Sequence, residues 1–226
     1  MQDCNTCVIR SKAADTLNAQ ELNILMESCA ETTFNPREKI IKEGILSSHI
    51  AYLKSGLAMV SKKGVKGIDQ ILKIVQHGNY IGLQTVLFEK VNQFSVTALE
   101  QCVVCFIDNL SFKELISRNT QFANELLLFL CREELTYFDR FVNIHQKQIN
   151  GRMADIILFF SEEINDHALT FNIPLTRSDM AALICTTRES ITRAIKDLVE
   201  VKTIRVSGKE FEILDLKRLQ KISQSG

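Results

Sequence analysis

Residues 120–149 are the most constraining part of the sequence, because this run contains neither glycine nor proline and is rich in helix-forming side chains. A continuous helix of about 30 residues is roughly 40 Å long. One β-rich domain cannot cover all sides of such a helix. The run therefore predicts a long helix that separates an N-terminal domain over residues 1–119 from a C-terminal domain over residues 150–226. Gly151 interrupts the helical pattern and predicts a hinge between the domains.

Apolar side chains in this run recur at the a and d spacing of a coiled coil. They are Leu127, Leu130, Tyr137, Phe141 and Ile144, with Glu134 as the exception and with Leu126, Phe129, Cys131 and Phe138 widening the stripe. A twin helix from a second copy would cover this stripe, which predicts a homodimer through residues 120–149. The alternative is a long helix wrapped by its own domain.

Glycines are concentrated in the N-terminal half, where six of the nine lie between Gly44 and Gly82. Between and after them are short β-rich runs at residues 49–56, 57–64, 70–78 and 94–108. Short strands separated by glycine turns predict a β-barrel of the cupin or jelly-roll type. Residues 17–30 predict one amphipathic helix before the barrel, so the expected fold class is α+β.

The C-terminal half contains two short apolar periods, and each follows a threonine with an acid three residues later. Thr176 with Asp179, and Thr186 with Glu189, predict two capping boxes. These caps predict helices at about residues 177–184 and 187–199. Residues 203–215 contain two β-rich runs around Ser207 and Gly208, which predict a hairpin directly after the second helix.

The predicted second helix has one apolar face and one polar face. Ile191, Ala194, Ile195, Leu198 and Val199 follow the spacing of a buried stripe. The opposite face carries Arg188, Glu189, Thr192, Arg193 and Lys196. Two helices joined by a short turn, followed by a hairpin, indicate a winged helix-turn-helix that binds DNA. The alternative is a helical hairpin with a solvated charged face.

The composition limits the classes of function. The chain has 226 residues and a formal net charge of zero, so any attraction to nucleic acid must be local; residues 174–209 carry seven Lys/Arg against four Asp/Glu. A polar N-terminus and the absence of a long apolar run predict a cytoplasmic protein without a membrane span. The seven cysteines are then thiols or metal ligands. No motif of an enzyme active site is found, so no enzymatic activity is expected.

The order of barrel, long helix and winged helix-turn-helix resembles the CRP/FNR family of bacterial transcription regulators. GNYIG at residues 78–82 resembles a barrel turn of that family, and LTRSDMAALICTTRESITRAIKDLV at 175–199 resembles its DNA-binding signature. Cys185 replaces the glycine usual in the turn between the helices, so a slightly different turn is expected.

The resemblance implies a homodimer on a near-palindromic double-stranded DNA operator, with RNA polymerase as a further partner. Arg188, Glu189 and Arg193 would face the major groove, where arginine binds guanine and glutamate binds cytosine, and a TGTGA-like half-site is favoured. The full set of expected DNA-binding residues is Thr176, Arg177, Thr187, Arg188, Glu189, Thr192, Arg193 and Lys196.

The resemblance also implies an effector site in or beside the barrel. The expected pocket residues are Gly78, Ile81, Gly82, Leu83, Phe94 and Ser95. Cyclic AMP is not expected there, because Leu83 and Phe94 stand where the family has the Glu and Arg that hold the nucleotide. No arginine lies between Arg37 and Arg118 to bind a phosphate.

Cysteines suggest a redox or metal signal. FNR-type oxygen sensors hold an iron–sulfur cluster with N-terminal cysteines plus one from this barrel strand, which implies Cys4, Cys7 and Cys105 as ligands. Strand geometry directs Cys102 and Cys105 to opposite faces, so only one can join such a site. The family's third N-terminal cysteine is absent near Ala13, and Cys29, expected on the first helix, or Cys102 would have to be the fourth ligand.

Two alternatives to a cluster remain open. The cysteines can be small buried apolar residues, as expected for Cys29, Cys131 and Cys185. A haem ligated by one of the histidines would sense oxygen or nitric oxide; the candidates are His49, His77, His145 and His167. A different class of function also remains, namely a redox- or metal-binding module whose winged helix contacts protein.

Overall fold

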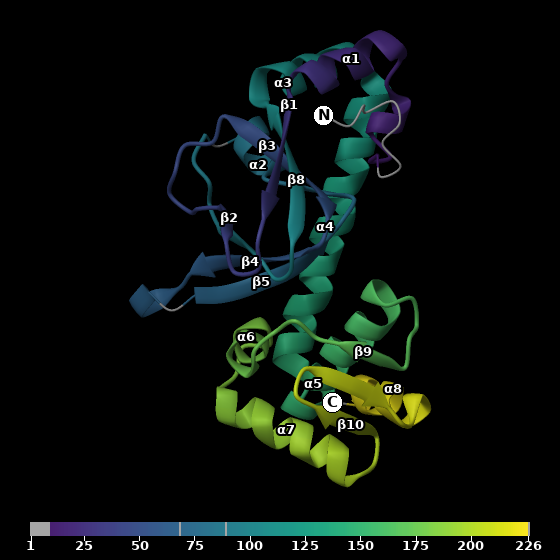
Figure 1. Ribbon diagram of the computed structural model, residues 1–226. Coiled ribbons are helices and arrows are strands. Elements are labelled where there is room, and N and C mark those ends of the chain that lie inside the picture. Colours follow the sequence, from purple (N-terminus) through teal and green to yellow (C-terminus); the bar gives the residue numbers. More distant parts are fainter. Residues whose placement is uncertain (1–9, 68, 89, 226) are drawn as a thin grey trace. The chain divides into compact units, whose positions relative to one another are not determined.

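The computed structural model describes residues 10–67, 69–88 and 90–225 (Figure 1). It divides into two compact units, with the boundary between Glu134 and Leu135. This boundary falls inside the long helix α4, Thr120–Gln146, so both units contain part of α4. Each unit has its own core and is described by itself. Within the described ranges, no helix is both long enough and apolar enough to cross a lipid bilayer.

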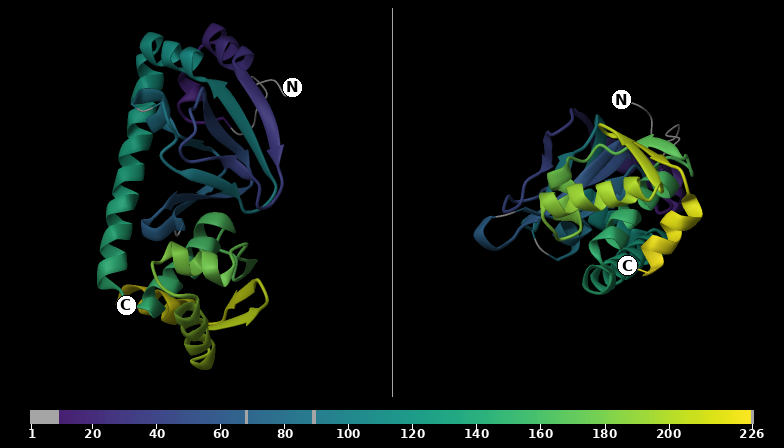
Figure 2. Two further views of the ribbon diagram at one scale, coloured as in Figure 1. Left: turned by 90° about the vertical axis from the view of Figure 1, so that its left-hand side faces the viewer. Right: turned by 90° about the horizontal axis from the view of Figure 1, so that it is seen from below.

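The N-terminal unit contains two four-stranded antiparallel sheets (Figures 1 and 2). One sheet has the order β1-β8-β3-β6 and the other β2-β7-β4-β5. The strands are β1 Cys29–Phe34, β2 Lys39–Ile41, β3 His49–Ser55, β4 Leu57–Lys63, β5 Asp69–Gln76, β6 Asn79–Ile81, β7 Ser95–Ala98 and β8 Cys102–Asp108.

The two sheets pack around one apolar core, and the first sheet has a second core on its outer face. In β3, Ala51 and Leu53 belong to the core between the sheets, whereas Ile50 and Tyr52 belong to the outer core. This alternation follows from the two-residue period of a strand. Because both faces are covered, β3 is apolar without the polar alternation of a half-exposed strand.

Helices cover the outer face of the sheet β1-β8-β3-β6. These helices are the 3₁₀ turn η1 Ala14–Thr16, α1 Ala19–Glu27, α3 Asn109–Arg118 and the first part of α4. A cap begins α1, because the Asn18 side chain accepts from the backbone of Glu21 at 3.0 Å and the Glu21 carboxylate accepts from the backbone of Asn18 at 2.9 Å. Two short helical segments complete the unit, η2 Val65–Gly67 and α2 Leu83–Leu87.

The C-terminal unit packs a small sheet and five helical segments, together with the last part of α4, around a core of its own. The sheet has the order β10-β11-β9. The elements are α5 Ile149–Phe159, the π-helical turn η3 Phe160–Ile164, β9 Thr170–Asn172, α6 Arg177–Leu183, α7 Arg188–Glu200, β10 Ile204–Ser207, β11 Glu210–Ile213 and α8 Leu216–Ser225. Both α7 and α8 pack on α5. The α+β class, the barrel, the long helix and the winged helix-turn-helix are therefore confirmed.

Several predicted boundaries are wrong for local reasons. Gly151 is buried inside α5, and the helical run breaks at Lys147 and Gln148 instead. The first amphipathic helix ends at Glu27, so Cys29 is the first residue of β1 and does not lie on a helix. The run at 94–108 is two strands, β7 and β8, because residues 99–101 are not in a strand.

The apolar residues of α4 divide between its two faces differently from the expected a and d register. Leu126 is buried in the outer core of the N-terminal unit, and Phe129 and Leu130 pack against that core. The large apolar residues that remain exposed fall partly in the predicted register and partly in a register one position later. These are Leu127, Leu128, Leu135, Tyr137, Phe138, Phe141 and Val142. We call Leu128, Leu135, Phe138 and Val142 the α4 stripe, because their spacing of seven, three and four residues places them on one side of the helix.

Candidate DNA-binding surface and sensor sites

The first helix of the helix-turn-helix, α6, begins at a reciprocal cap. Thr176 is the N-cap residue, and its Oγ1 accepts a hydrogen bond from the backbone N–H of Asp179 at 3.1 Å. The Asp179 carboxylate accepts in return from the backbone N–H of Thr176 at 2.8 Å. The predicted capping box is therefore confirmed. It satisfies two backbone donors that the first helical turn leaves without a partner.

The turn after α6 is a Schellman motif. The backbone N–H of Thr186 donates to the carbonyl of Ala181 at 3.0 Å, and Cys185 between them has a left-handed backbone with φ of +56°. Glycine adopts this backbone without strain, whereas a residue with a Cβ pays roughly 1–2 kcal/mol. The expectation that Cys185 changes the turn is wrong: the left-handed turn is kept despite the larger side chain.

Two arginines from other helices cap the last carbonyls of α6. Arg140 of α4 donates to the carbonyl of Leu183, and Nη1 of Arg152 in α5 donates to the carbonyl of Ile184 at 2.7 Å. A positive charge suits a helix C-terminus, where carbonyl groups lack partners and the helix dipole is negative. Burial lowers the pKa of the Arg140 guanidinium from its ordinary value. These contacts fix α6 to the rest of its unit.

The second helix, α7, begins one residue later than the capping pattern indicated. Thr187 is the N-cap, and its Oγ1 accepts from the backbone N–H of Ser190 at 3.2 Å. The predicted capping box of Thr186 and Glu189 is therefore wrong. The Glu189 carboxylate accepts from its own backbone N–H and from the Thr187 side chain, and these hydrogen bonds lower the pKa of Glu189. Glu189 is therefore a hydrogen-bond acceptor at neutral pH.

The two faces of α7 differ as the sequence predicts. The buried residues are Ile191, Ala194, Ile195 and Leu198, each at most 7% exposed. Val199 was expected on this face but is 40% exposed. The exposed polar residues are Arg188, Glu189, Thr192, Arg193 and Lys196, and we call them the α7 row. Lys196 also lies 3.5 Å from Glu200, a surface ion pair of little energetic weight.

The other three predicted contact residues lie around the start of the two helices. Thr176 and Thr187 are exposed at their cap positions. Arg177 is half-buried: its guanidinium carbon lies 5.4 Å from the centroid of the Phe211 ring, and Nη1 lies 3.5 Å from the sulfur of Met180. Burial lowers the pKa of Arg177. Arg177 therefore packs α6 against the wing strand β11.

The predicted hairpin is confirmed as β10 and β11. Their register runs from Ile204 opposite Ile213 to Ser207 opposite Glu210, which leaves Gly208 and Lys209 as a two-residue loop. Gly208 has a φ of +63°, which a glycine adopts readily at the first loop position. The loop residues are exposed, so Lys209 provides a positive charge at the tip of the wing.

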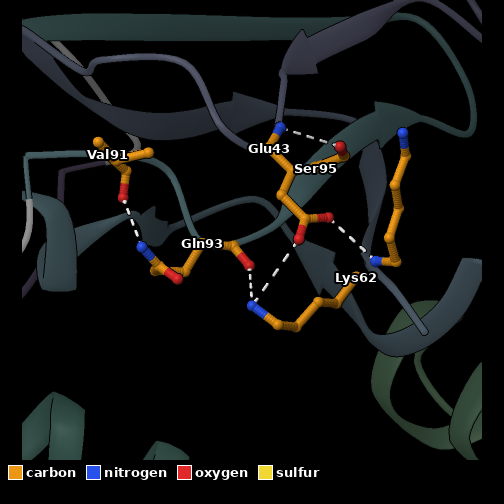
Figure 3. A network of polar contacts seen from close by, with 6 residues as sticks. Glu43, Lys62, Val91, Gln93 and Ser95 are labelled. Carbon is orange, nitrogen blue, oxygen red and sulfur yellow. Dashed lines mark hydrogen bonds and ion pairs between the residues drawn. The ribbon is translucent and has the colours of Figure 1, made fainter. Parts of the chain in front are cut away.

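The predicted effector residues lie on both sides of one sheet. Ile81 and Phe94 contact the core between the sheets, whereas Leu83 is buried in the outer core. Gly82 begins α2 with a φ of +89°. Ser95 is only 6% exposed, and its Oγ accepts from the backbone N–H of Glu43 at 3.1 Å (Figure 3).

Glu43 brings a negative charge next to Ser95. Lys62 lies 3.8 Å from the Glu43 carboxylate, and its ammonium group donates to the carbonyl of Gln93 at 2.5 Å (Figure 3). The nearest cation in this network is therefore already paired. This arrangement does not favour a phosphate group at Ser95.

The two cysteines of β8 face opposite sides, as strand geometry predicts. Cys102 is fully buried in the core between the sheets, and burial raises the pKa of its thiol to about 11. Cys105 packs against the outer core, and a hydrogen bond from Cys29, supported by Lys54, lowers the pKa of its thiol. Cys131 and Cys185 are exposed, so the expectation that they lie in apolar surroundings is wrong.

The predicted metal ligands Cys4 and Cys7 lie outside the described residues. Across the part of the chain that the structure describes, no three metal-binding side chains gather at one point. Of the predicted ligand set, the described residues therefore supply Cys105 alone.

Two regions of the chain match known domain families. Residues 31–119 match the cyclic nucleotide-binding domain, and residues 151–222 match the Crp-like helix-turn-helix domain. The cAMP-activated global transcriptional regulator CRP of Escherichia coli O6:H1 is 24% identical over 196 residues, covering 85% of this chain and 93% of that protein.

Two further relatives span nearly the whole chain. The transcriptional activator protein FnrL of Cereibacter sphaeroides is 22% identical over 228 residues, covering 96% of this chain and 90% of that protein. A crystal structure of a CRP/FNR family regulator from Eubacterium rectale has a TM-score of 0.78 at 16% identity, covering 95% of this chain and 98% of that chain. These relatives are regulators of transcription and not enzymes.

Proposed function

The chain belongs to the CRP/FNR family of DNA-binding transcription regulators, and from that premise we propose that it acts as a homodimer whose two α7 rows contact a near-palindromic operator. The observation that carries this proposal is the exposed α7 row itself. A helix with one face fixed by buried apolar residues and the other left polar has the form that helix-turn-helix proteins insert into the major groove.

The chemistry of the α7 row suits base recognition. Arg188 and Arg193 can each donate two hydrogen bonds to O6 and N7 of guanine, and the ionised Glu189 can accept from N4 of cytosine. A TGTGA-like half-site remains the proposed sequence. Thr192 and Lys196 extend the same face.

The remaining predicted contacts suit the DNA backbone. Thr176 and Thr187 are exposed at helix N-termini, where backbone N–H groups also point outward and attract phosphate. Arg177 would help mainly by holding α6 against Phe211. Lys209 at the tip of the wing can reach a neighbouring phosphate, which would orient the unit on the duplex.

The α4 stripe supports the homodimer. Leu135 and Phe138 are 61% and 56% exposed, and side chains of this size are unfavourable in water when they form a continuous row. A second copy of α4 would bury the row and make the pair symmetric. Two-fold symmetry would then place two α7 rows on half-sites about one helical turn apart.

We propose that the N-terminal unit responds to a signal other than cAMP. The support is the lack of any arginine between Arg37 and Arg118, and the hydrogen bond of Ser95 to the backbone of Glu43, whose carboxylate pairs with Lys62. A redox, oxygen or nitric oxide signal is the class we favour. The ion pair between Lys73 of β5 and Glu133 of α4 offers one route from the barrel to the long helix. We further propose a cytoplasmic location and RNA polymerase as a second partner.

Binding to duplex DNA at increasing salt tests this function. A fluorescent duplex library enriched for binding should yield a near-palindromic sequence, and affinity for it should fall steeply with salt because phosphate contacts release counterions. Lys217→Ala is the control, since Lys217 is exposed on α8 and is not part of the α7 row. Failure to bind any duplex, with retained dimerisation, would instead favour the alternative function, a winged helix that contacts protein.

A further inference from the structure

Cys29 and Cys105 lie on the same face of adjacent strands. Strands β1 and β8 lie side by side (Figure 1), and in their register Cys29 is opposite Ile107 and Glu31 is opposite Cys105, so the two cysteines are diagonal neighbours. A side-chain hydrogen bond from Cys29 lowers the pKa of the Cys105 thiol. Both side chains are partly exposed, so a small molecule can reach them.

A cavity surrounds this pair on the outer face of the sheet. Its volume is about 440 Å³, including the part open to solvent, and Tyr52, Tyr80 and Lys54 line it together with the two cysteines. The other lining residues include Arg10 and Ser11, which precede the first helical turn, and Ser11 Oγ lies 2.8 Å from the Tyr80 hydroxyl. No histidine is among the described residues of its wall.

The charged groups near the cavity are two ion pairs. Lys54 lies 2.6 Å from Glu31, and Arg10 lies 3.2 Å from Asp15. The hydrogen bond from Cys29 is the main effect that lowers the pKa of the Cys105 thiol; burial and Glu31 oppose it, and Lys54 adds to it. A thiol that is partly exposed, adjacent to a cation and in contact with a second thiol has the environment of a redox-active cysteine.

We propose that Cys29 and Cys105 form a redox-active dithiol that a hydroperoxide oxidises to an intramolecular disulfide. In the first step, the Cys105 sulfur attacks one oxygen of the hydroperoxide; an S–O bond forms and the O–O bond breaks. The thiol proton leaves with the departing oxygen as an alcohol or water, and Cys105 becomes a sulfenic acid. Cys29 then attacks that sulfur, the S–S bond forms and water leaves. The hydroperoxide accepts the two electrons.

The strand arrangement permits this bond with a small movement. Disulfides join Cα atoms about 4.4–6.8 Å apart, whereas diagonal neighbours on antiparallel strands are about 7–8 Å apart, so the strands must approach by roughly 1 Å. β1 is the edge strand of its sheet and pairs with β8 alone in the sheet order. It can therefore shift without breaking a second row of hydrogen bonds.

A shift of β1 would be transmitted directly to α3. Ser28, next to Cys29, accepts a hydrogen bond through its carbonyl from the backbone N–H of Asp108 at 3.0 Å. Asp108 is the N-cap of α3, which leads into α4. The proposed disulfide does not require DNA binding, so the experiment measures the oxidation of the two cysteines directly.

The other described cysteines serve as internal controls. Cys102 is three residues from Cys105 but is buried on the opposite face. Cys131 and Cys185 are more exposed than the pair but lie outside the cavity. If exposure alone decided oxidation, Cys131 and Cys185 would react first.

The test uses the full-length protein, reduced and freed of reductant under nitrogen. One equivalent of hydrogen peroxide or of cumene hydroperoxide is added, remaining thiols are alkylated, and tryptic peptides are mapped without reduction. We expect residues 13–37 linked to residues 91–113, with fragment ions assigning the bond to Cys105. The two oxidants distinguish an aqueous peroxide from an organic one.

Variants separate the two steps. Cys29→Ser should leave a sulfenic acid on Cys105 that dimedone labels, and Cys105→Ser should slow peroxide consumption by at least about tenfold. Cys131→Ser should form the bridge like the wild type, and Cys29→Ala repeats the test if the serine variant misfolds. Oxidation of Cys131 or Cys185 before the pair, or a bridge through Cys102, would overturn the proposal.

Discussion

Two helices of this protein each leave one face exposed, and the side chains on those faces differ in kind. α7 exposes a row of arginine, glutamate, threonine and lysine, whereas α4 exposes leucine, phenylalanine and valine. In both helices the opposite face carries buried or packed apolar residues. The chemistry of the exposed face therefore distinguishes the partners: hydrogen-bonding groups suit base edges, and apolar groups suit a second copy.

The largest effect should come from a charge placed in the α4 stripe. Phe138→Glu would bury two symmetric carboxylates without partners in the proposed dimer, which should weaken association by about 3 kcal/mol or more, roughly a hundredfold. Sedimentation equilibrium measures this directly. Arg193→Ala is the matched control and should dimerise like the wild type. An unchanged monomer–dimer equilibrium in Phe138→Glu would remove the α4 stripe from the interface.

The next largest effect concerns the contact that holds α6 in place. Arg152→Met keeps much of the side-chain volume but leaves the Ile184 carbonyl without its charged donor, so the free energy of unfolding should fall by about 1.5–3 kcal/mol. Urea denaturation followed by circular dichroism measures the change. The control Lys209→Met replaces an exposed side chain at the tip of the wing and should change stability by less than about 0.5 kcal/mol. Equal losses of stability in Arg152→Met and Lys209→Met would show that the hydrogen bond from Arg152 to the Ile184 carbonyl contributes little to stability.

A change in the α7 row should alter binding and leave folding intact. Arg193→Ala should weaken binding to the selected operator by about 1–3 kcal/mol and reduce discrimination at one base pair of each half-site. Titration of labelled duplexes that differ at single base pairs measures both quantities. Lys217→Ala should change neither. If Arg193→Ala lowered affinity equally for every sequence, Arg193 would contact phosphate and not a base.

The smallest effect tests the turn that sets the start of α7. Cys185→Gly removes the strain of a left-handed cysteine but adds entropy to the unfolded chain, so we expect a net gain of roughly 0.5 kcal/mol in the free energy of unfolding. Gly208→Ala is the reverse control: a Cβ there has open space but a positive φ, so stability should fall by about 1 kcal/mol. Destabilisation by Cys185→Gly would show that the cysteine side chain makes a useful contact.

Local patterns were enough to predict much of the C-terminal unit. The Thr176 capping box and the two faces of α7 depend on residues no more than a few turns apart. The start of α7 was misplaced because Thr186 and Thr187 are both suitable caps. The left-handed backbone at Cys185 decides between them, and a cysteine gives no sign of it.

Contacts between distant residues could not be read from the sequence. Arg140 and Arg152 reach carbonyl groups 43 and 32 residues away, and no periodicity marks such a pair. The sequence suggested Cys29 only as an alternative fourth ligand, and its direct pairing with Cys105 was missed because a boundary error of three residues placed Cys29 on a helix. Its face and neighbour became apparent only with the register of β1 against β8.

The most direct test of the central claim, that the α7 row lies against base pairs, combines protein and DNA changes. Replacing the contacted guanine with 7-deazaguanine removes the N7 acceptor that an arginine would bind. A double-mutant cycle with Arg193→Ala, and a second with Arg188→Ala, then measures the coupling between side chain and base. We predict that the wild type binds the modified operator more weakly than the unmodified one. For either Arg193→Ala or Arg188→Ala, the same modification should cause no further loss of affinity. Independent, additive losses in both cycles would contradict the account.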